Sequence, residues 1–255
     1  YVEQGFGDAI QFVRFVKPLA AKAERIVLEC RAELMELLST AEGLDAVIDR
    51  DASPPEFDVH APLLSLPHLL GTTVDNIPAD VPYLKATEDR IEQWRERLGE
   101  GGFKVGINWQ GNPSYMADHF RSIALRLFEP VANIPDVRLI SLQKSHGLDQ
   151  LENLPPGMTI ETLGDDFDEG PDAFKDTAAV MMSLDLIITS DTSIAHLGGA
   201  LARPVWTLLP HVPDWRWMLD RDDSPWYPGM RLFRQPASGE WESVFERIRE
   251  ELLSD

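Results

Sequence analysis

Short apolar segments alternate along the chain with longer segments in which apolar residues recur every three or four positions. The short segments predict strands and the longer, periodic ones predict helices. Strands that alternate with helices are typical of parallel β-α-β units, so we expect an α/β fold. In the second half, strands are predicted at residues 103–109, 137–142, 159–163, 185–189 and 205–209, and helices near 123–131, at 173–184, from Thr192 and over 241–252.

In the first hundred residues the pattern is sparser. Four apolar residues follow the i, i+3, i+4, i+7 spacing of a helix face, and Pro18 is expected to kink or end that helix. The four are Phe12, Phe15, Val16 and Leu19, and further on the chain predicts strands at residues 25–29, 46–48 and 57–60 and a helix at 32–38.

A boundary between two lobes is predicted near residue 100. Residues 71–83 show little periodicity, and the helix predicted at 88–98 is followed by two glycines, as is common after a helix C-terminus. Open parallel sheets bind ligands at the carboxyl ends of their strands, so we expect two doubly wound, Rossmann-like lobes with a ligand cleft between them. The expected division is a small or incomplete lobe at 1–100, a second lobe at 101–238 and a final helix at 239–255.

The chain is strongly acidic. It has 23 Lys and Arg residues against 43 Asp and Glu residues, a formal net charge of -20, and it has no basic run. Such a chain does not neutralise a phosphate backbone, so we expect no nucleic-acid partner. A small phosphorylated ligand is compatible with this charge only where local chemistry overcomes the global field.

The single cysteine, Cys30, excludes an internal disulfide and any metal site built from several cysteines. No run approaches the roughly 18 apolar residues of a membrane span. Together these features predict a cytoplasmic protein. The chain opens at Tyr1, directly ahead of a structured motif, so we expect it to be a piece of a longer polypeptide.

The strongest local signal follows the strand predicted at residues 185–189. Asp191, Thr192 and Ser193 are typical N-cap residues, so a helix is expected to begin at the carboxyl end of that strand. Its free N–H groups and positive dipole end form a ready site for a diphosphate. His196 shares a helix face with Thr192 and Ser193 and is expected to help bind the anion. The alternative is that Asp191 only caps the helix and His196 is a buried structural residue.

A second loop is predicted at the same edge of the sheet. The strand at 103–109 ends in Trp109 and continues into a polar loop with Gly111 and Asn112, long enough to wrap a ligand. Arg121, near the start of the next helix, can contact a phosphate through two N–H groups. The alternative is an ordinary surface loop with an exposed arginine.

A third loop, after the strand at 137–142, places the amide of Gln143 and the cation of Lys144 at this edge. Lysine in such a position is more often solvated than bound to a ligand.

Near the start of the chain, Gln4-Gly5-Phe6-Gly7-Asp8 forms a glycine turn that leads into a helix containing Gln11. The glycines permit close approach of a ligand to the backbone, and Asp8 is expected in the first helical turn, facing the cleft. The third glycine of a dinucleotide-binding motif is absent, which disfavours a nicotinamide cofactor. The alternative is that Asp8 is a helix cap and nothing more.

Two other clusters are better explained as structural features than as binding sites. An aromatic and proline-rich region could form a wall for stacking sugars, but a packed loop is favoured because buried Trp is mainly packing material. The acidic run around Asp166 and Asp168 resembles a solvated loop more than a divalent metal site, so no metal is expected. The aromatic residues are Trp206, Trp215, Trp217, Trp226 and Tyr227.

Taken together, five segments resemble the glycosyltransferase-like region of certain bacterial tetratricopeptide-repeat proteins, which is similar to glycosyltransferase family nine, the lipopolysaccharide heptosyltransferases. The resemblance covers nearly the whole chain, and its most specific part is the Asp-Thr-x-x-x-His segment. The segments are Gln4–Asp8, Trp109–Pro113, Arg121–Ile123, Ser141–Lys144 and Asp191–Leu197.

The resemblance implies a GT-B architecture, with an acceptor lobe first, a nucleotide-sugar lobe second and a final helix that crosses back onto the first lobe. It implies helical repeats upstream, and a first lobe shorter than in the heptosyltransferases, so that the acceptor does not carry over. By the same resemblance, Asp8 matches the general base and Gln4, Gly5, Gly7 and Gln11 lie in the acceptor-side loop; the donor-binding residues are Trp109, Gly111, Asn112, Arg121, Gln143, Lys144, Asp191, Thr192, Ser193 and His196.

The leading hypothesis is therefore a metal-independent, inverting glycosyltransferase that moves a sugar from a nucleoside diphosphate sugar to a hydroxyl on a glycan, lipid or protein, without a bound cofactor. Two alternatives are kept. One is a nucleotide-sugar sensor or scaffold attached to tetratricopeptide repeats, and the other is a nucleotide-sugar epimerase, because one fold hosts many functions.

Overall fold

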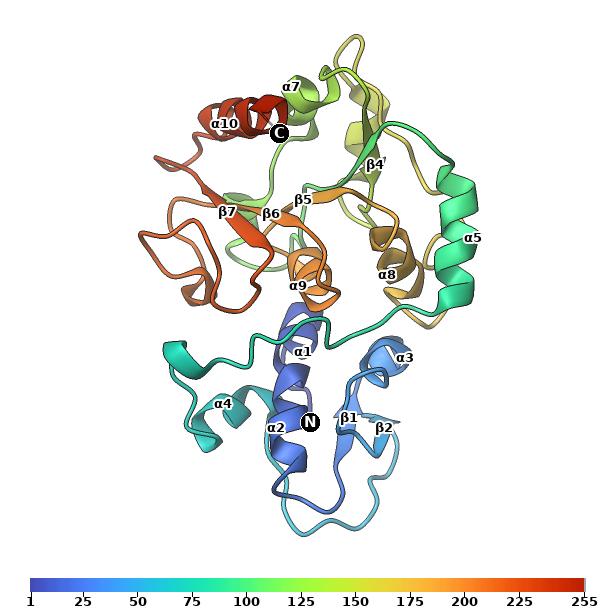
Figure 1. Cartoon of the computed structure of the whole chain (residues 1–255), viewed down its shortest axis with the longest axis vertical. Coiled ribbons are helices and arrows are strands. Elements are labelled where there is room, and N and C mark those ends of the chain that lie inside the picture. The colour runs from blue at the N-terminus through green and yellow to red at the C-terminus, as the bar shows by residue number, and fades with distance from the viewer. Residues whose placement is uncertain (255) are drawn as a thin grey trace.

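A five-stranded parallel sheet forms the centre of the larger part of the molecule (Figure 1). The computed structural model describes residues 1–254. Strand order in the sheet is β4-β3-β5-β6-β7. The strands are β3 (Phe103–Asn108), β4 (Val137–Ser141), β5 (Leu186–Ser190), β6 (Val205–Leu209) and β7 (Met230–Arg234).

Both faces of this sheet are apolar, as expected for parallel strands covered on two sides. In β5, Ile187 packs into one buried cluster, while Leu186 and Ile188 pack into the other. Helices therefore lie on both faces (Figure 1). One face is covered by α8 (Lys175–Met181), with α5 (Glu88–Leu98) packed on it, and by α9 (Ser193–Ala200); the other is covered by α7 (Glu129–Ala132) and α10 (Glu242–Ser254), and α6 (Asp118–Arg121) lies in the loop after β3.

The smaller part holds a two-stranded parallel sheet of β1 (Val27–Cys30) and β2 (Ala46–Asp49). The third strand predicted there, at residues 57–60, is an irregular segment whose Val59 side chain is 86% exposed, because no neighbouring strand pairs with it. The described residues of this part thus do not form the doubly wound lobe that we predicted. Its helices are α1 (Phe6–Phe12), α2 (Val16–Ala20), α3 (Met35–Leu38) and α4 (Leu66–Leu69).

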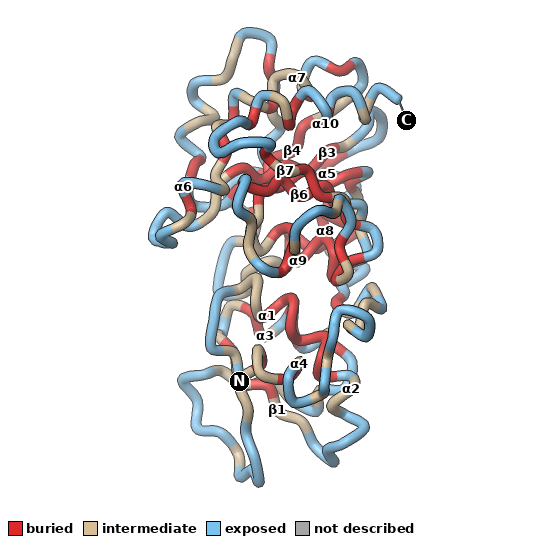
Figure 2. Tube along the Cα trace, turned by 90° about the vertical axis from the view of Figure 1, so that its left-hand side faces the viewer, coloured by how far each residue is buried: buried red, intermediate tan, exposed pale blue. Residues whose placement is uncertain are grey.

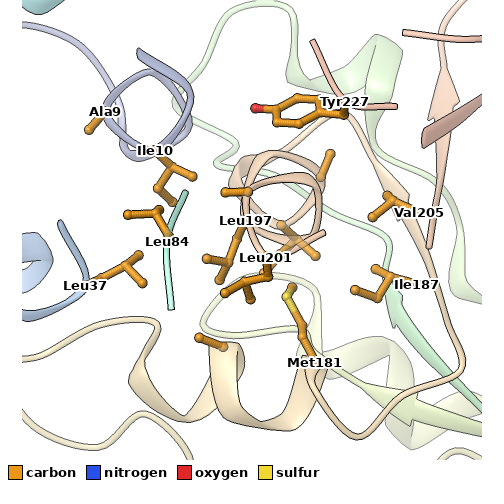
Figure 3. Packing of buried hydrophobic residues seen from close by; sticks show 14 of the residues in the cluster. Ala9, Ile10, Leu37, Leu84, Met181, Ile187, Leu197, Leu201, Val205 and Tyr227 are labelled. Carbon is orange, nitrogen blue, oxygen red and sulfur yellow. The ribbon is translucent and has the colours of Figure 1, made fainter. Parts of the chain in front are cut away.

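One continuous hydrophobic core joins the two parts. It runs from the sheet through α8 and α9 into α1 and the two-stranded sheet. Figure 3 shows Ile10 of α1 and Leu84 facing Leu197 of α9 and Leu201, the residue that follows this helix. The buried residues accordingly follow the middle of the molecule, while the exposed ones lie around it (Figure 2). This packing fixes α1 against α9.

The expectation that the final helix crosses back onto the first lobe is wrong. α10 packs on α7 and β7, with Val244, Phe245 and Ile248 in the cluster on that face of the sheet. The Phe245 ring lies 4.7 Å from that of Phe128. The apolar stripe of α10 is buried there, so the helix stays with the larger part.

Two strands also differ from prediction. Residues 159–163 contribute a single bridge, between Glu161 and Ile140, rather than a strand. β7 was not predicted. Across residues 1–254, the structure contains no helix with the length and apolar character needed to cross a bilayer.

Candidate functional site

The order of the strands locates a candidate site. β3 pairs with β4 on one side and with β5 on the other, so the chain changes direction across the sheet at this point. In open α/β sheets, ligands bind outside the carboxyl ends of the strands at such a switch point. The loops that leave β3 and β5 carry Arg121 and Asp191.

Arg121 connects these two loops. Its Nη1 donates to the carbonyl oxygen of Asp191 at 2.6 Å, and its Nε donates to Asp118 Oδ1 at 3.0 Å. A Cβ atom at Gly111 would lie 2.6 Å from Arg121 Nη2 and closer still to Asp118 Oδ1, so the loop packs tightly against this ion pair. The loop is therefore built around this arginine, and the structure does not support the alternative of a solvated surface residue.

The start of α9 faces the same loops. Thr192, rather than Asp191, is the N-cap, and its Oγ1 accepts from Ile194 N at 3.4 Å and donates to Asn108 Oδ1 at 3.0 Å. The N–H of Ser193 has no acceptor among residues 1–254. The positive end of the helix thus carries a backbone donor that is not used within the described residues.

Asp191 is half-buried beside this helix start. Burial raises the pKa of its carboxyl to about 6, although the Trp217 indole and the Arg121 guanidinium act in the opposite direction. The alternative that Asp191 only caps the helix is not supported, because its side chain does not make the cap.

His196 is buried behind the start of α9. Its ring stacks on Trp217 with centroids 5.3 Å apart, and its Nδ1 lies 2.9 Å from the hydroxyl of Tyr227. Burial, and next the charge of Arg216, hold the pKa of His196 well below its ordinary value. The imidazole is therefore neutral and adds no positive charge to an anion site.

Asp8 lies at the junction of the two parts. Its Oδ2 accepts from the Gly5 N–H at 2.9 Å, so the carboxylate binds the backbone of the residue before the first turn of α1. Its Oδ1 forms an ion pair with Arg216 Nη2. Next to it, a Cβ atom at Gly7 would lie 3.5 Å from Ser193 Cα. Asp8 therefore caps its helix and also reaches the neighbourhood of α9.

The remaining predicted acceptor-side residues fall into two groups. Gln4 is exposed. Gln11 is fully buried, and its Oε1 accepts from Arg216 Nε at 2.6 Å. Gln11 thus helps to hold Arg216 and does not line an open surface.

Four of the predicted donor-binding residues have other roles. Trp109 is fully buried and donates from Nε1 to Gly147 O at 3.2 Å, so its side chain belongs to the core. Gln143 accepts three hydrogen bonds and donates two, to Gln110 O and His146 O, which ties two loops together and leaves its amide no free donor. Lys144 donates to Phe167 O, and Asn112 is exposed and accepts from the Ser114 N–H at 2.9 Å through Oδ1.

Sequence reasoning missed Arg216, which is 9% exposed and forms the ion pair with Asp8. It lies in the 3₁₀ turn Trp215–Trp217 of the loop after β6. The available signal was a basic residue between two tryptophans in a strongly acidic chain. The aromatic cluster itself is packed as favoured, since Trp217, Trp226 and Tyr227 are buried, although Trp215 is 61% exposed.

The acidic loop before α8 is also explained by structure. Asp166 forms an ion pair with Arg97 at 2.7 Å. Asp168 accepts from the Asp176 N–H at 2.7 Å and caps α8. These two carboxylates are engaged in folding contacts.

No protein-family model matches the chain. A curated relative is protein FlbA of Caulobacter vibrioides, 26% identical over 196 residues, which are 75% of this chain and 32% of FlbA. The chain therefore spans about a third of the length of that relative.

Solved structures of similar fold are glycosyltransferases. A family 9 glycosyltransferase from Veillonella parvula has a TM-score of 0.66 at 13% identity, over 99% of this chain and 95% of its own. ADP-heptose lps heptosyltransferase II from E. coli has a TM-score of 0.62 at 13% identity, over 99% and 96%. Heptosyltransferase WaaC from E. coli, solved with ADP, has a TM-score of 0.60 at 11% identity, over 99% and 98%. The chain thus has the mixed α/β fold of the glycosyltransferase family 9 heptosyltransferases.

Proposed function

We propose that the chain binds a nucleoside diphosphate sugar at the carboxyl ends of β3 and β5 and transfers the sugar to a hydroxyl acceptor. The observation that carries this proposal is the bond from Arg121 to the Asp191 carbonyl, which holds a cation beside the open start of α9. A structure of the same fold is described in complex with ADP, which supports a nucleoside diphosphate as the ligand.

Transfer needs stabilisation of the charge that grows on the departing diphosphate. The Arg121 guanidinium, the Ser193 N–H and the dipole of α9 supply it in this proposal without a metal ion. Asp8 accepts the proton of the acceptor hydroxyl while that oxygen bonds to the anomeric carbon and the diphosphate leaves with the electron pair of the broken bond. Attack from the face opposite the diphosphate inverts the anomeric centre.

Calorimetric titration with ADP, UDP, GDP and CDP, and with nucleoside diphosphate sugars of the same four nucleotides, tests the binding step. Arg121→Gln should weaken binding about tenfold, because a charge-assisted contact is lost. Arg126→Gln is the matched control, since Arg126 is exposed and the change in net charge is the same. Equal affinities of the two variants would show that the nucleotide does not bind beside Arg121 and the start of α9. In a transfer assay, Asp8→Asn should stop acceptor-dependent release of the nucleoside diphosphate.

A non-catalytic nucleotide-sugar module is the second candidate. This candidate is favoured by the contacts of the Asp8 carboxylate. One oxygen accepts the Gly5 N–H and the other is ion-paired with Arg216, so neither is free to accept a proton from an acceptor. Binding without transfer across a panel of acceptors supports this candidate, and conversion of the donor sugar without any acceptor supports an epimerase. The upstream tetratricopeptide repeats stay a prediction.

A further inference from the structure

Arg216 is the only ion-pair partner of Asp8 among residues 1–254, and the two residues come from different parts of the chain. The Arg216 side chain has three partners. Nη2 contacts Asp8, Nη1 donates to Asp214 Oδ1 at 2.9 Å, and Nε donates to Gln11 Oε1 at 2.6 Å. One guanidinium therefore connects the loop after β6 to α1 by two separate side chains.

The same guanidinium lies close to the start of α9. After burial, its charge is the largest cause of the lowered pKa of His196, and it also acts on the carboxyl of Asp191. Next to Asp8, Gly7 packs directly against Ser193 and His196. Arg216 and the start of α9 therefore both border the Gly7–Asp8 segment.

Two N–H donors, one on α1 and one at the start of α9, have no acceptor among the described residues. Gln11 Nε2 is buried and has no hydrogen-bond partner in the described structure, while Oε1 of the same amide binds Arg216. An unpaired buried N–H is costly and points to a missing acceptor. The Ser193 N–H is likewise without an acceptor in residues 1–254. Gln11 is fully buried, so the donor that a ligand rich in acceptor oxygens can use is the Ser193 N–H at the start of α9.

We infer that Arg216 is shared between Asp8 and the diphosphate of the ligand, an inference that rests on the proposed function. Without ligand, Arg216 holds Asp8 Oδ1 through one nitrogen. A diphosphate offers several charged oxygens to the planar fork of N–H groups and draws Arg216 toward α9. Asp8 Oδ1 is then released for the acceptor, so the nucleotide sugar binds before the acceptor. Asp214 keeps Arg216 within reach of both partners.

Because Asp8 and the diphosphate compete for one cation, removing the carboxylate must tighten diphosphate binding. Calorimetric titrations with ADP and with UDP at constant ionic strength measure this. Asp8→Asn should bind the nucleotide about fivefold or more tightly than the native chain, the lower end of typical coupling between sites. Asp223→Asn removes the same charge from the exposed Arg221 ion pair and should leave affinity unchanged.

The dependence on Arg216 is tested in a second background. Arg216→Lys keeps the positive charge but loses the planar set of N–H donors of the guanidinium, so it should weaken nucleotide binding. Adding Asp8→Asn to this variant should not tighten binding further. Thermal unfolding of each variant checks that it is folded.

The possible results separate the two claims. Absence of ADP and UDP binding in every variant overturns the proposed function and this inference with it. Binding that Arg121→Gln weakens, but that Asp8→Asn leaves equal to Asp223→Asn, overturns the inference alone. Equal tightening by Asp8→Asn with Arg216 or Lys at position 216 also overturns it, because general electrostatics then explain the effect.

Discussion

Gly7 in α1 lies against the His196 ring in α9 so closely that a Cβ atom at Gly7 would be 2.9 Å from Cδ2 of His196. The His196 ring is held in place by Trp217 on one face and by the Tyr227 hydroxyl at Nδ1. The ring therefore has no room to yield. This contact sets the distance between α1, which carries Asp8, and the start of α9.

Gly7→Ala should destabilise the fold by about 1 to 2 kcal/mol, because overpacking outweighs the better helix propensity of alanine. The free energy of unfolding in urea measures this. Gly229→Ala is the control, since its Cβ would meet nothing closer than Arg203 O at 3.6 Å. A Gly7→Ala protein as stable as the control would contradict the tight contact.

Asp191→Asn should stabilise the protein near neutral pH. Burial raises the pKa of Asp191 from 3.8 to about 6. The folded state therefore binds the proton more tightly than the unfolded state, and its free energy of unfolding falls as the pH rises from about 3.8 through about 6. The variant should gain about 2 to 3 kcal/mol at pH 7.5 and nothing near pH 3.8. Urea unfolding across this range measures the difference, and a gap independent of pH would contradict the raised pKa.

Tyr227→Phe should cost about 1 to 3 kcal/mol, because it leaves the buried Nδ1 of His196 without its partner. The free energy of unfolding measures the loss. Tyr115→Phe removes the same atom from a half-exposed ring and should be neutral. Equal effects of the two substitutions would show that the Tyr227 hydroxyl is not needed.

Phe245→Ala should cost about 3 to 5 kcal/mol, because α10 buries this ring against Phe128. Leu253→Ala lies on the same helix with its side chain 53% exposed, and it should cost less than about 0.5 kcal/mol. Thermal or urea unfolding compares them. Similar stabilities would place α10 elsewhere than on α7.

Local patterns predicted the elements that local physics controls. β5 and α9 begin within a residue or two of the predicted positions, because a buried apolar run is followed directly by N-cap residues. β7 was missed because arginines interrupt its apolar pattern. One of them, Arg231, is paired with Glu251 on α10, a partner that lies outside any local window.

The sequence by itself determined the α/β class, the parallel β-α-β units of the larger part and the open start of α9, since these depend on periodicity and capping within a few residues. Tertiary structure decided which of the predicted side chains meet. Packing placed Trp109 in the core, engaged Gln143 in the loops and turned Lys144 toward Phe167. It also joined Arg216 to Asp8 across 208 residues, and no local pattern carries a contact of that separation.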